Sequence, residues 1–513
     1  MPQCGRRPLN RPAAPRDPTR PDPTRPDPTR PDPTRPEETI GMSEELTWLP
    51  AWRIRELIGK REVSCVEVTE HFLGRIEEFN PTLRAFEQVD AAGAREQARR
   101  ADRAVAGGEA LGPLHGIPTS VKSHIRVEGL RYVQPGTDVV STFDDIGVER
   151  LRRAGAIIIG TNTMMGAGAD LTLARDRPGV FSPFNWDAEA LSPWDTTRVP
   201  GWSSSGGAAT AAARLLPVTI GSDGGGSTRL PAAYSGVVGL HTSRGLIPHV
   251  NYDKPTMLLT ASYGPLARYV RDAALFTRAM SGGDGRDYVC LQDDTPDPLD
   301  ALDRGIEGMS MAWTEDFGFA ATYATADSAR IIDVARAAAH SLATLGATVE
   351  PTEEVWEDRA ERGTVRWTVE PSVYEAMVGT NTAPLPALDP VLYREQAQSR
   401  ARNWERFQRL FRRHDVILSV TAQRIAAPVE EWERAWTVDG PAFPGGSFAP
   451  VYCSHTMIFN WLGFPAVTVP CGFVDGLPVG LQIAAWHGRE DLVLRVAQAF
   501  QQAFPRDEHP AVS

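Results

Sequence analysis

The chain has 513 residues, of which 42% are hydrophobic and 23% charged, and its formal net charge is −12 at neutral pH. This composition is typical of a soluble globular protein, and the negative balance argues against nucleic acid as the main partner. No run of about 18 apolar residues is present, so the sequence predicts no membrane span. The N-terminus lacks the charged-then-apolar pattern of a signal peptide. Five scattered cysteines without metal-ligand spacing predict reduced thiols, no metal and a cytoplasmic protein.

Residues 1–41 differ in composition from the rest of the chain. The sequence Arg-Pro-Asp-Pro-Thr repeats from Arg20, Arg25 and Arg30. Proline at every second or third position forbids a helix or a central strand, and few apolar side chains are available for burial. We predict a disordered or polyproline-like tail, which an upstream start codon would also explain, followed by one folded domain over 42–513.

Helix and strand signals alternate along that domain. Ser64 and Glu67 form a capping-box pattern, and apolar residues then follow at helical spacing until Asn80-Pro81, where we expect the helix to end. Short apolar runs predict buried strands at 156–159, 218–220, 466–469 and 479–484. The small and apolar residues at 208–216 predict a helix. Such alternation predicts an α/β fold with a mixed, largely parallel sheet covered by helices on both faces.

The densest glycine and serine pattern lies between Pro200 and Pro231. It begins with Ser-Ser-Ser-Gly-Gly at 203–207 and ends with Ser-Asp-Gly-Gly-Gly-Ser at 222–227. Glycine allows backbone N–H groups to approach a ligand closely. A serine beside a row of such groups can attack a carbonyl while they hold the developing oxyanion.

Three other interpretations of this pattern fit less well. A flexible linker would not contain the strand-like residues 217–220. Residues 221–226 lack the Gly-x-Gly-x-x-Gly spacing of a dinucleotide loop. The nucleophile elbow Gly-x-Ser-x-Gly fails because Ser205 stands at its last glycine position.

Lys122 ends the segment Gly116-Ile-Pro-Thr-Ser-Val-Lys122. A single lysine is more often solvated, but the apolar and small residues here predict burial, which would keep the amine neutral at pH 7. A neutral lysine and two serines suffice for nucleophilic acyl transfer without histidine.

These segments together resemble the amidase signature family. The family pattern falls without a gap on Gly201, Ser203, Ser204, Ser205, Gly206, Asp223, Ser227, Arg229 and Pro231, and the catalytic lysine of the family falls on Lys122. The core motif covers 116–248, and the resemblance extends from about Trp48 to about Phe504. It implies a single large domain built around a twisted sheet.

The resemblance also implies a mechanism. Ser227 would be the nucleophile, Ser203, which follows a cis peptide bond after Trp202, would relay the proton, and Lys122 would be the base. No cofactor or metal is required. The backbone N–H groups of four residues would form the oxyanion hole: Gly224, Gly225, Gly226 and Ser227. Other residues would support the loop, Asp223 and Arg229 as a buried ion pair and Ser204, Ser205 and Ser222 through hydrogen bonds.

The chain departs from the family pattern beside the chemistry. Trp202 stands where a small residue is usual, Gly224 adds a third glycine, Thr228 replaces an aliphatic residue, and Ser123-His124 stands where many members have Asp-Asn. Candidate substrate-pocket residues are Trp202, Met164, Phe184 and Trp194. An aromatic-rich region at about 356–454 is expected either to pack in the core or to form part of an apolar substrate cleft and its lid.

These features favour neutral, fairly hydrophobic aryl or alkyl carboxamides, with carbamates (urethanes) and esters as further substrates, as in an aryl-amidase or urethanase-like subgroup. We expect a small-molecule substrate and no nucleic-acid or membrane partner. A homodimer is one possible assembly. One alternative is an amidotransferase A-like subunit for transfer-RNA-dependent amidation, which would need a partner chain. Another is a non-catalytic interaction protein on an amidase scaffold, against which the intact Lys122, Ser203 and Ser227 argue.

Overall fold

A computed structural model describes residues 42–134, 137–164, 190–250, 260–291, 295–352, 390–431, 452–506 and 508–512. Residues Ser43–Ser513 form one compact unit. The predicted tail, 1–41, lies outside the described residues. So does the aromatic-rich region at about 356–454, except for 390–431 and 452–454.

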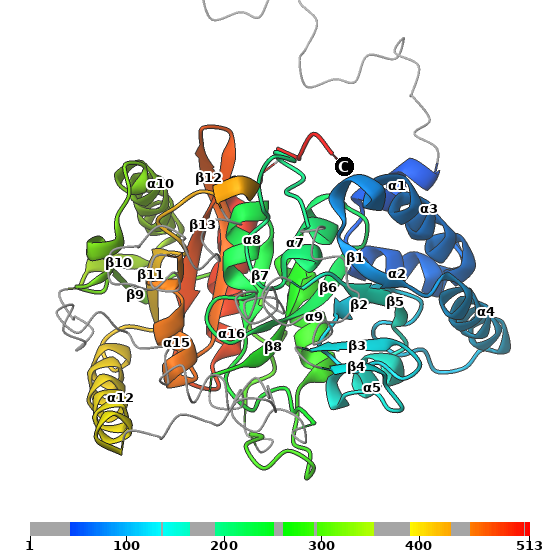
Figure 1. Cartoon of the computed structure of the whole chain (residues 1–513), viewed down its shortest axis with the longest axis horizontal. Helices are drawn as coiled ribbons and strands as arrows, with labels where there is room; N and C mark the ends of the chain where they lie inside the picture. Colours follow the sequence, from blue (N-terminus) through cyan, green and yellow to red (C-terminus); the bar gives the residue numbers. More distant parts are fainter. Residues whose placement is uncertain are drawn as a thin grey trace, which may run out of the picture. The chain divides into compact units, whose positions relative to one another are not determined.

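One large sheet organises the described residues (Figure 1). Its strands, in spatial order, are β1 (Phe86–Val89), β5 (Ile157–Asn162), β2 (Pro118–Lys122), β6 (Val218–Asp223), β8 (Ser262–Ala267), β7 (Val238–His241), β12 (Ala466–Val474), β13 (Leu477–Ala484), β11 (Val416–Val420), β9 (Ser310–Trp313) and β10 (Thr348–Pro351). A separate hairpin joins β3 (Arg131–Gln134) and β4 (Thr137–Val140). The four predicted strands are confirmed as β5, β6, β12 and β13.

The sheet is mixed, as predicted, but it is not largely parallel. Among the described strands, only the β5–β2, β2–β6, β11–β9 and β9–β10 pairs are parallel, and the other six neighbouring pairs are antiparallel. The longest antiparallel pair, β12 and β13, is joined by Asp475 and Gly476, whose φ angles are 52° and 77°. Two positive φ angles in a two-residue Asp-Gly loop produce a tight hairpin, so no helix crosses between these strands.

Helices cover both faces of the sheet. Leu266 and Ala267 are adjacent on β8, and successive strand residues point to opposite faces. Leu266 packs in a cluster with α7 (Ser205–Ala212) and α8 (Arg229–Ser235), whereas Ala267 packs in the main cluster with α9 (Val270–Met280), α10 (Ser328–Ser341) and α16 (Glu490–Ala503). A further cluster covers Ala466 and Ala484 with residues of α15 (Met457–Leu462) on the face opposite Val467. The prediction of two covered faces is therefore confirmed.

The described helices are α1 (Met42–Trp48), α2 (Ala51–Lys60), α3 (Cys65–Leu83), α4 (Ala91–Gly107), α5 (Ile146–Arg153), α7 (Ser205–Ala212), α8 (Arg229–Ser235), α9 (Val270–Met280), α10 (Ser328–Ser341), α12 (Pro390–Phe411), α15 (Met457–Leu462) and α16 (Glu490–Ala503), with short 3-10 turns η2 (Ala320–Tyr323) and η3 (Leu342–Leu345). None of the helices in the described ranges is both long and apolar enough to cross a bilayer.

Two helix boundaries differ from the sequence prediction. The capping box of Ser64 and Glu67 is present, but α3 continues through Pro81 to Leu83. Pro81 lies in the last turn of this helix, so the hydrogen bond lost with its missing N–H lies at the end of the helix. The helix predicted at 208–216 instead begins at Ser205 and ends at Ala212, so that it starts inside the first serine cluster.

Candidate active site

Two parallel strands bring the sequence motifs together at one edge of the sheet. Lys122 is the last residue of β2 and Asp223 is the last residue of β6, and Val121 pairs with Ile220 in the ladder between these strands. The chain then turns into α8, while α7 begins directly after Ser204. Loops at the carboxyl ends of parallel strands are where α/β proteins place their ligand sites.

Lys122 is buried, as predicted, with 1% of its surface exposed. Its Nζ lies 2.5 Å from the Ser203 hydroxyl oxygen. It also lies 3.3 Å from the hydroxyl oxygen of Ser222 and 3.4 Å from the carbonyl oxygen of that residue. The peptide bond between Trp202 and Ser203 is cis, as expected. The structure thus joins the lysine to the first serine cluster.

Few residues of the two serine clusters reach solvent. Ser203 and Ser227 are half-buried, whereas Ser204, Ser205 and Ser222 are buried. The Ser204 N–H donates to the Ser227 carbonyl oxygen at 3.1 Å, which ties one cluster to the other. A hydrogen bond between the Ser203 and Ser227 hydroxyl groups is not among those of the described residues. Such catalytic contacts are often long before substrate binds.

The predicted ion pair of Asp223 and Arg229 is present and has no exposed surface. Arg229 Nε lies 2.9 Å from Asp223 Oδ2, and its terminal nitrogen lies 3.0 Å from Oδ1. Burial alone would raise the pKa of Asp223, but the charge and hydrogen bonds of Arg229 hold this pKa well below its usual value. The carboxylate also accepts N–H groups of Gly226, Thr228 and Arg229, so it folds the loop around itself.

Three residues that hold this loop were missed from the sequence. Thr456 donates its hydroxyl to the Gly225 carbonyl oxygen at 2.6 Å. Asn460, on α15, donates to Asp223, and Gln482, on β13, accepts from Arg229 at 2.8 Å. They lie more than 220 residues from their partners, so no local spacing connects them. Gln482 does lie within the range of the family resemblance, in the segment Gly476-Leu-Pro-Val-Gly-Leu-Gln482, which also resembles the family.

The oxyanion-hole prediction needs one correction. The N–H of Gly226 donates to Asp223 Oδ1 at 2.6 Å, so this group belongs to the buried network rather than to a substrate oxygen. Gly226 has a φ of 128°, which explains the need for glycine. The N–H groups of Gly224, Gly225 and Ser227 stay as the predicted donors.

The supporting serines are also only partly as expected. The Ser204 hydroxyl donates to the Ser222 carbonyl oxygen at 3.2 Å, and the Ser222 N–H donates back to that hydroxyl at 3.4 Å. The Ser205 hydroxyl is buried and has no hydrogen-bond partner among the described residues. Ser205 is the first residue of α7.

The structure describes three of the four candidate pocket residues. Trp202 is half-buried against the cluster that contains α15, and its ring centroid lies 5.3 Å from that of Tyr452. Met164 is half-buried two residues beyond Asn162, which pairs with Lys122 at the same sheet edge. Phe184 lies outside the described residues.

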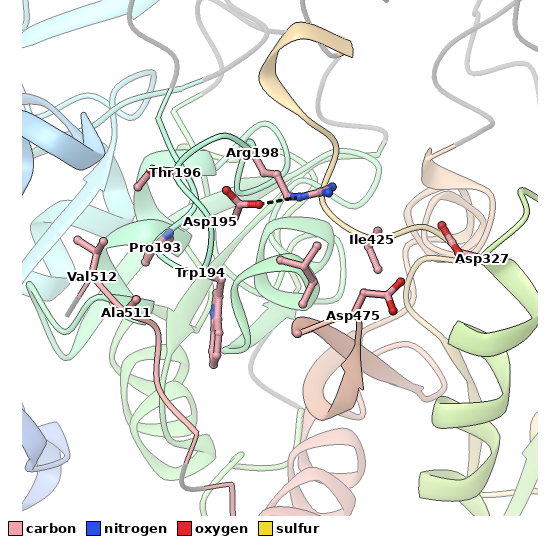
Figure 2. Close-up of a pocket in the computed structure, with 12 residues that line it drawn as sticks. Pro193, Trp194, Asp195, Thr196, Arg198, Asp327, Ile425, Asp475, Ala511 and Val512 are labelled. Carbon is pink, nitrogen blue, oxygen red and sulfur yellow. Dashed lines mark hydrogen bonds and ion pairs between the residues drawn. The ribbon is translucent and has the colours of Figure 1, made fainter.

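Trp194 does not lie with the catalytic serines. Its indole N–H donates to the Ser235 carbonyl oxygen at 2.8 Å, at the C-terminal end of α8. Ser227 precedes the other end of that helix, so the two are separated by roughly 10 Å of helix. Trp194 instead lines a surface cavity of about 670 Å³ with Arg198, Asp327 and Asp475 (Figure 2). The proline-containing sequence around Trp194 does not predict that this side chain contacts the end of α8.

The arrangement has the parts required for acyl transfer. A buried amine is hydrogen-bonded to one half-exposed serine, and a second half-exposed serine follows a glycine run held by a buried ion pair. No group of three or more His, Cys, Asp or Glu side chains in the described ranges is arranged to hold a metal ion.

Comparisons with known proteins identify the family of this chain. The Amidase family model matches residues 67–362 and 368–494. An acylamidase of Rhodococcus erythropolis is 29% identical over 498 residues, covering 92% of this chain and 98% of the relative. The A subunit of the glutamyl-tRNA(Gln) amidotransferase of Roseiflexus castenholzii is 31% identical over 484 residues, covering 87% and 94%. The solved structure of a bacterial aryl acylamidase matches with a TM-score of 0.74 at 24% identity, covering 90% of this chain and 97% of that one, which shows the shared fold. The chain belongs to the amidase signature family, as its sequence motifs predicted.

Proposed function

We propose that this protein hydrolyses the C–N bond of neutral, fairly hydrophobic carboxamides through an acyl-enzyme on Ser227. The observation that carries the proposal is the 2.5 Å contact between buried Lys122 and half-exposed Ser203. Burial disfavours the charged form of an amine, so a buried lysine can be neutral and accept the proton of a neighbouring hydroxyl group. Ser227 is the other half-exposed serine of the two clusters.

In the proposed mechanism, Ser227 attacks the substrate carbonyl as its proton passes to Ser203 and the Ser203 proton passes to Lys122. The N–H groups of Gly224, Gly225 and Ser227 stabilise the oxyanion. The proton returns through Ser203 to the leaving amine, and the C–N bond breaks. Water then attacks the acyl-enzyme by the same proton path and releases the acid.

The substrate class rests on the surroundings of Ser203. Trp202 is half-buried, precedes Ser203 and packs against Tyr452, which supports a flat apolar wall suited to aryl groups. Similarity to an acylamidase over nearly the whole chain supports amides as the main substrates. Carbamates and esters, whose carbonyls react through the same acyl-enzyme, are the proposed side substrates.

A second candidate is the A subunit of a transfer-RNA-dependent amidotransferase, which a 31% identical relative favours. Such a protein would supply ammonia for transfer-RNA-dependent amidation and would purify with a partner chain. Hydrolysis of anilides by the isolated chain, with no requirement for a partner, would favour the amidase. Glutamine hydrolysis that occurs only with a copurifying partner chain would favour the amidotransferase.

The test combines active-site labelling with a substrate panel. A fluorophosphonate probe should label the wild-type protein and Ser341→Ala, whose serine lies on α10, but not Ser227→Ala. Turnover of anilides, carbamates and aliphatic amides should be lost in Ser227→Ala by many orders of magnitude. Wild-type turnover by folded Ser227→Ala would rule out the assignment. No labelling of the wild type would favour a non-catalytic scaffold.

A further inference from the structure

Ser222 connects the buried lysine to a histidine that the proposed mechanism does not use. The Ser222 hydroxyl oxygen lies 3.3 Å from Lys122 Nζ and 2.9 Å from His124 Nε2. Each of the three residues is at most 5% exposed. His124 follows Lys122 by two residues, at the position where the sequence departs from the common family pattern. A chain of hydrogen bonds therefore runs from His124 through Ser222 and Lys122 to Ser203.

The number of hydrogens on these side chains limits which group can donate and which can accept in each hydrogen bond. A hydroxyl has one hydrogen to donate and two lone pairs that accept. If Ser222 donates to His124 Nε2, both of its lone pairs are left for N–H groups of Lys122. A neutral amine has two N–H bonds and one lone pair. Its two N–H bonds can then be directed to the hydroxyl and carbonyl oxygens of Ser222, at 3.3 and 3.4 Å.

The contact of the amine with Ser203 decides the consequence. With both N–H bonds directed to Ser222, the lone pair of Lys122 is left for its shortest contact, the Ser203 hydroxyl at 2.5 Å. If His124 instead donated from Nε2, the Ser222 hydrogen would turn toward Lys122. It would then compete with Ser203 for the lone pair.

We propose that His124 is a positioning residue: it accepts a hydrogen bond from Ser222 and thereby directs the Lys122 lone pair toward Ser203. This inference rests on the proposed function, because it requires Lys122 to be the base for Ser203. It assigns His124 the tautomer with its hydrogen on Nδ1, the one that leaves Nε2 as an acceptor. The proton transferred in catalysis does not pass through His124.

Variants of His124 and Ser222 separate positioning from packing. Glutamine at 124 can place an amide oxygen near the position of Nε2, whereas leucine fills a similar volume without an acceptor. Ser222→Ala removes the connecting hydroxyl. His115, a buried histidine whose Nε2 lies 3.0 Å from the Ala101 carbonyl oxygen, provides the matched control His115→Leu.

We expect His124→Leu and Ser222→Ala to lower kcat for an anilide by about 10–100-fold, as when a residue that orients a metal ligand is removed. KM should change little, and His124→Gln should recover most of kcat. The double variant should lose no more than either single variant, because both act through one hydrogen-bond chain. His115→Leu should lower the melting temperature without this kcat effect.

Three results would overturn the inference: wild-type kcat in His124→Leu, additive losses in the double variant, or an equal kcat loss in His115→Leu. If His124→Leu does not fold, Ser222→Ala and His124→Gln still test the positioning role of His124. Nitrogen-15 NMR of the His124 ring gives a readout that does not depend on turnover. A hydrogen on Nε2 would refute the positioning role even if the protein is an active amidase. A hydrogen on Nδ1 in a protein that hydrolyses no amide would refute the proposed function instead.

Discussion

Two glycines of the run before Ser227 are predicted to respond oppositely to substitution by alanine. Gly226 has a φ of 128°, and an added Cβ would lie 2.3 Å from Thr456 Oγ1 and 2.9 Å from Leu230 Cδ1. Gly224 lies outside the left-handed region. An added Cβ there would meet only Ala261 Cβ, at 3.8 Å, among the described residues. The backbone and the neighbouring side chains therefore require glycine at 226 but not at 224.

The magnitudes follow from these contacts. A non-glycine residue held at such a φ costs about 1–3 kcal/mol. Moving Thr456 away from the new Cβ would also break its hydrogen bond to the Gly225 carbonyl oxygen, worth about 1 kcal/mol. Gly226→Ala should therefore destabilise the fold by about 2–4 kcal/mol. Gly224→Ala should be neutral or stabilise it by up to about 1 kcal/mol, because alanine reduces the entropy of the unfolded chain.

The assay is denaturant unfolding of both variants and the wild type, followed by fluorescence and circular dichroism. Fluorophosphonate labelling of the folded variants then reports on the loop itself. Gly226→Ala should label more slowly, because its strain acts on the residue before Ser227. Equal unfolding midpoints for Gly226→Ala and the wild type would refute the reasoning. A Gly224→Ala protein as unstable as Gly226→Ala would do the same.

Two further predictions concern the pocket and the pH dependence of stability. Trp202→Gly should keep the catalytic groups but shift relative kcat/KM from aryl toward small aliphatic amides by about 1–3 kcal/mol; an unchanged ratio with lower stability would make Trp202 a structural support only. Burial raises the pKa of Asp272, which accepts the N–H groups of Ala51 and Trp52, to about 6. Because the folded pKa is above the unfolded value of about 3.9, the stabilisation is complete below about pH 4 and is lost as the pH rises through 6. The unfolding free energy of the wild type should thus fall relative to Asp272→Asn by about 2–3 kcal/mol between pH 4 and 7. Parallel pH curves for the two proteins would contradict this.

The sequence predicted those features that short-range chemistry determines. The capping box at Ser64 needs only residues three positions apart, and it is present. The buried strands follow from short apolar runs, and the Asp223–Arg229 pair joins residues six positions apart. The burial of Lys122 also followed from its own apolar neighbours. Each of these signals lies within one turn, strand or loop.

Features that depend on distant partners were not predictable in the same way. Strand direction was misjudged because buried parallel and antiparallel strands have similar apolar runs. The Asp475-Gly476 pair, a typical hairpin signal, would have corrected it for one strand pair. Gly226 was expected to bind an oxyanion because nothing nearby shows that its N–H meets a carboxylate also held by Asn460. Trp194 was expected in the substrate pocket, but its indole bonds to Ser235, at the end of α8 far from Ser227.

The division between buried and half-buried residues in the loops explains how this site can combine a fixed mechanism with a variable substrate. Asp223 and Arg229 are fully buried, and removing one partner of such a pair leaves an uncompensated charge that costs about 3–5 kcal/mol. Those positions are therefore constrained by folding as well as by chemistry. Trp202 and Gly224 are half-buried, and neither belongs to the ion-pair network. Substitution at these two positions can reshape the space beside the two serine clusters without disturbing the ion pair that holds the loop, and at both positions this chain departs from the family pattern.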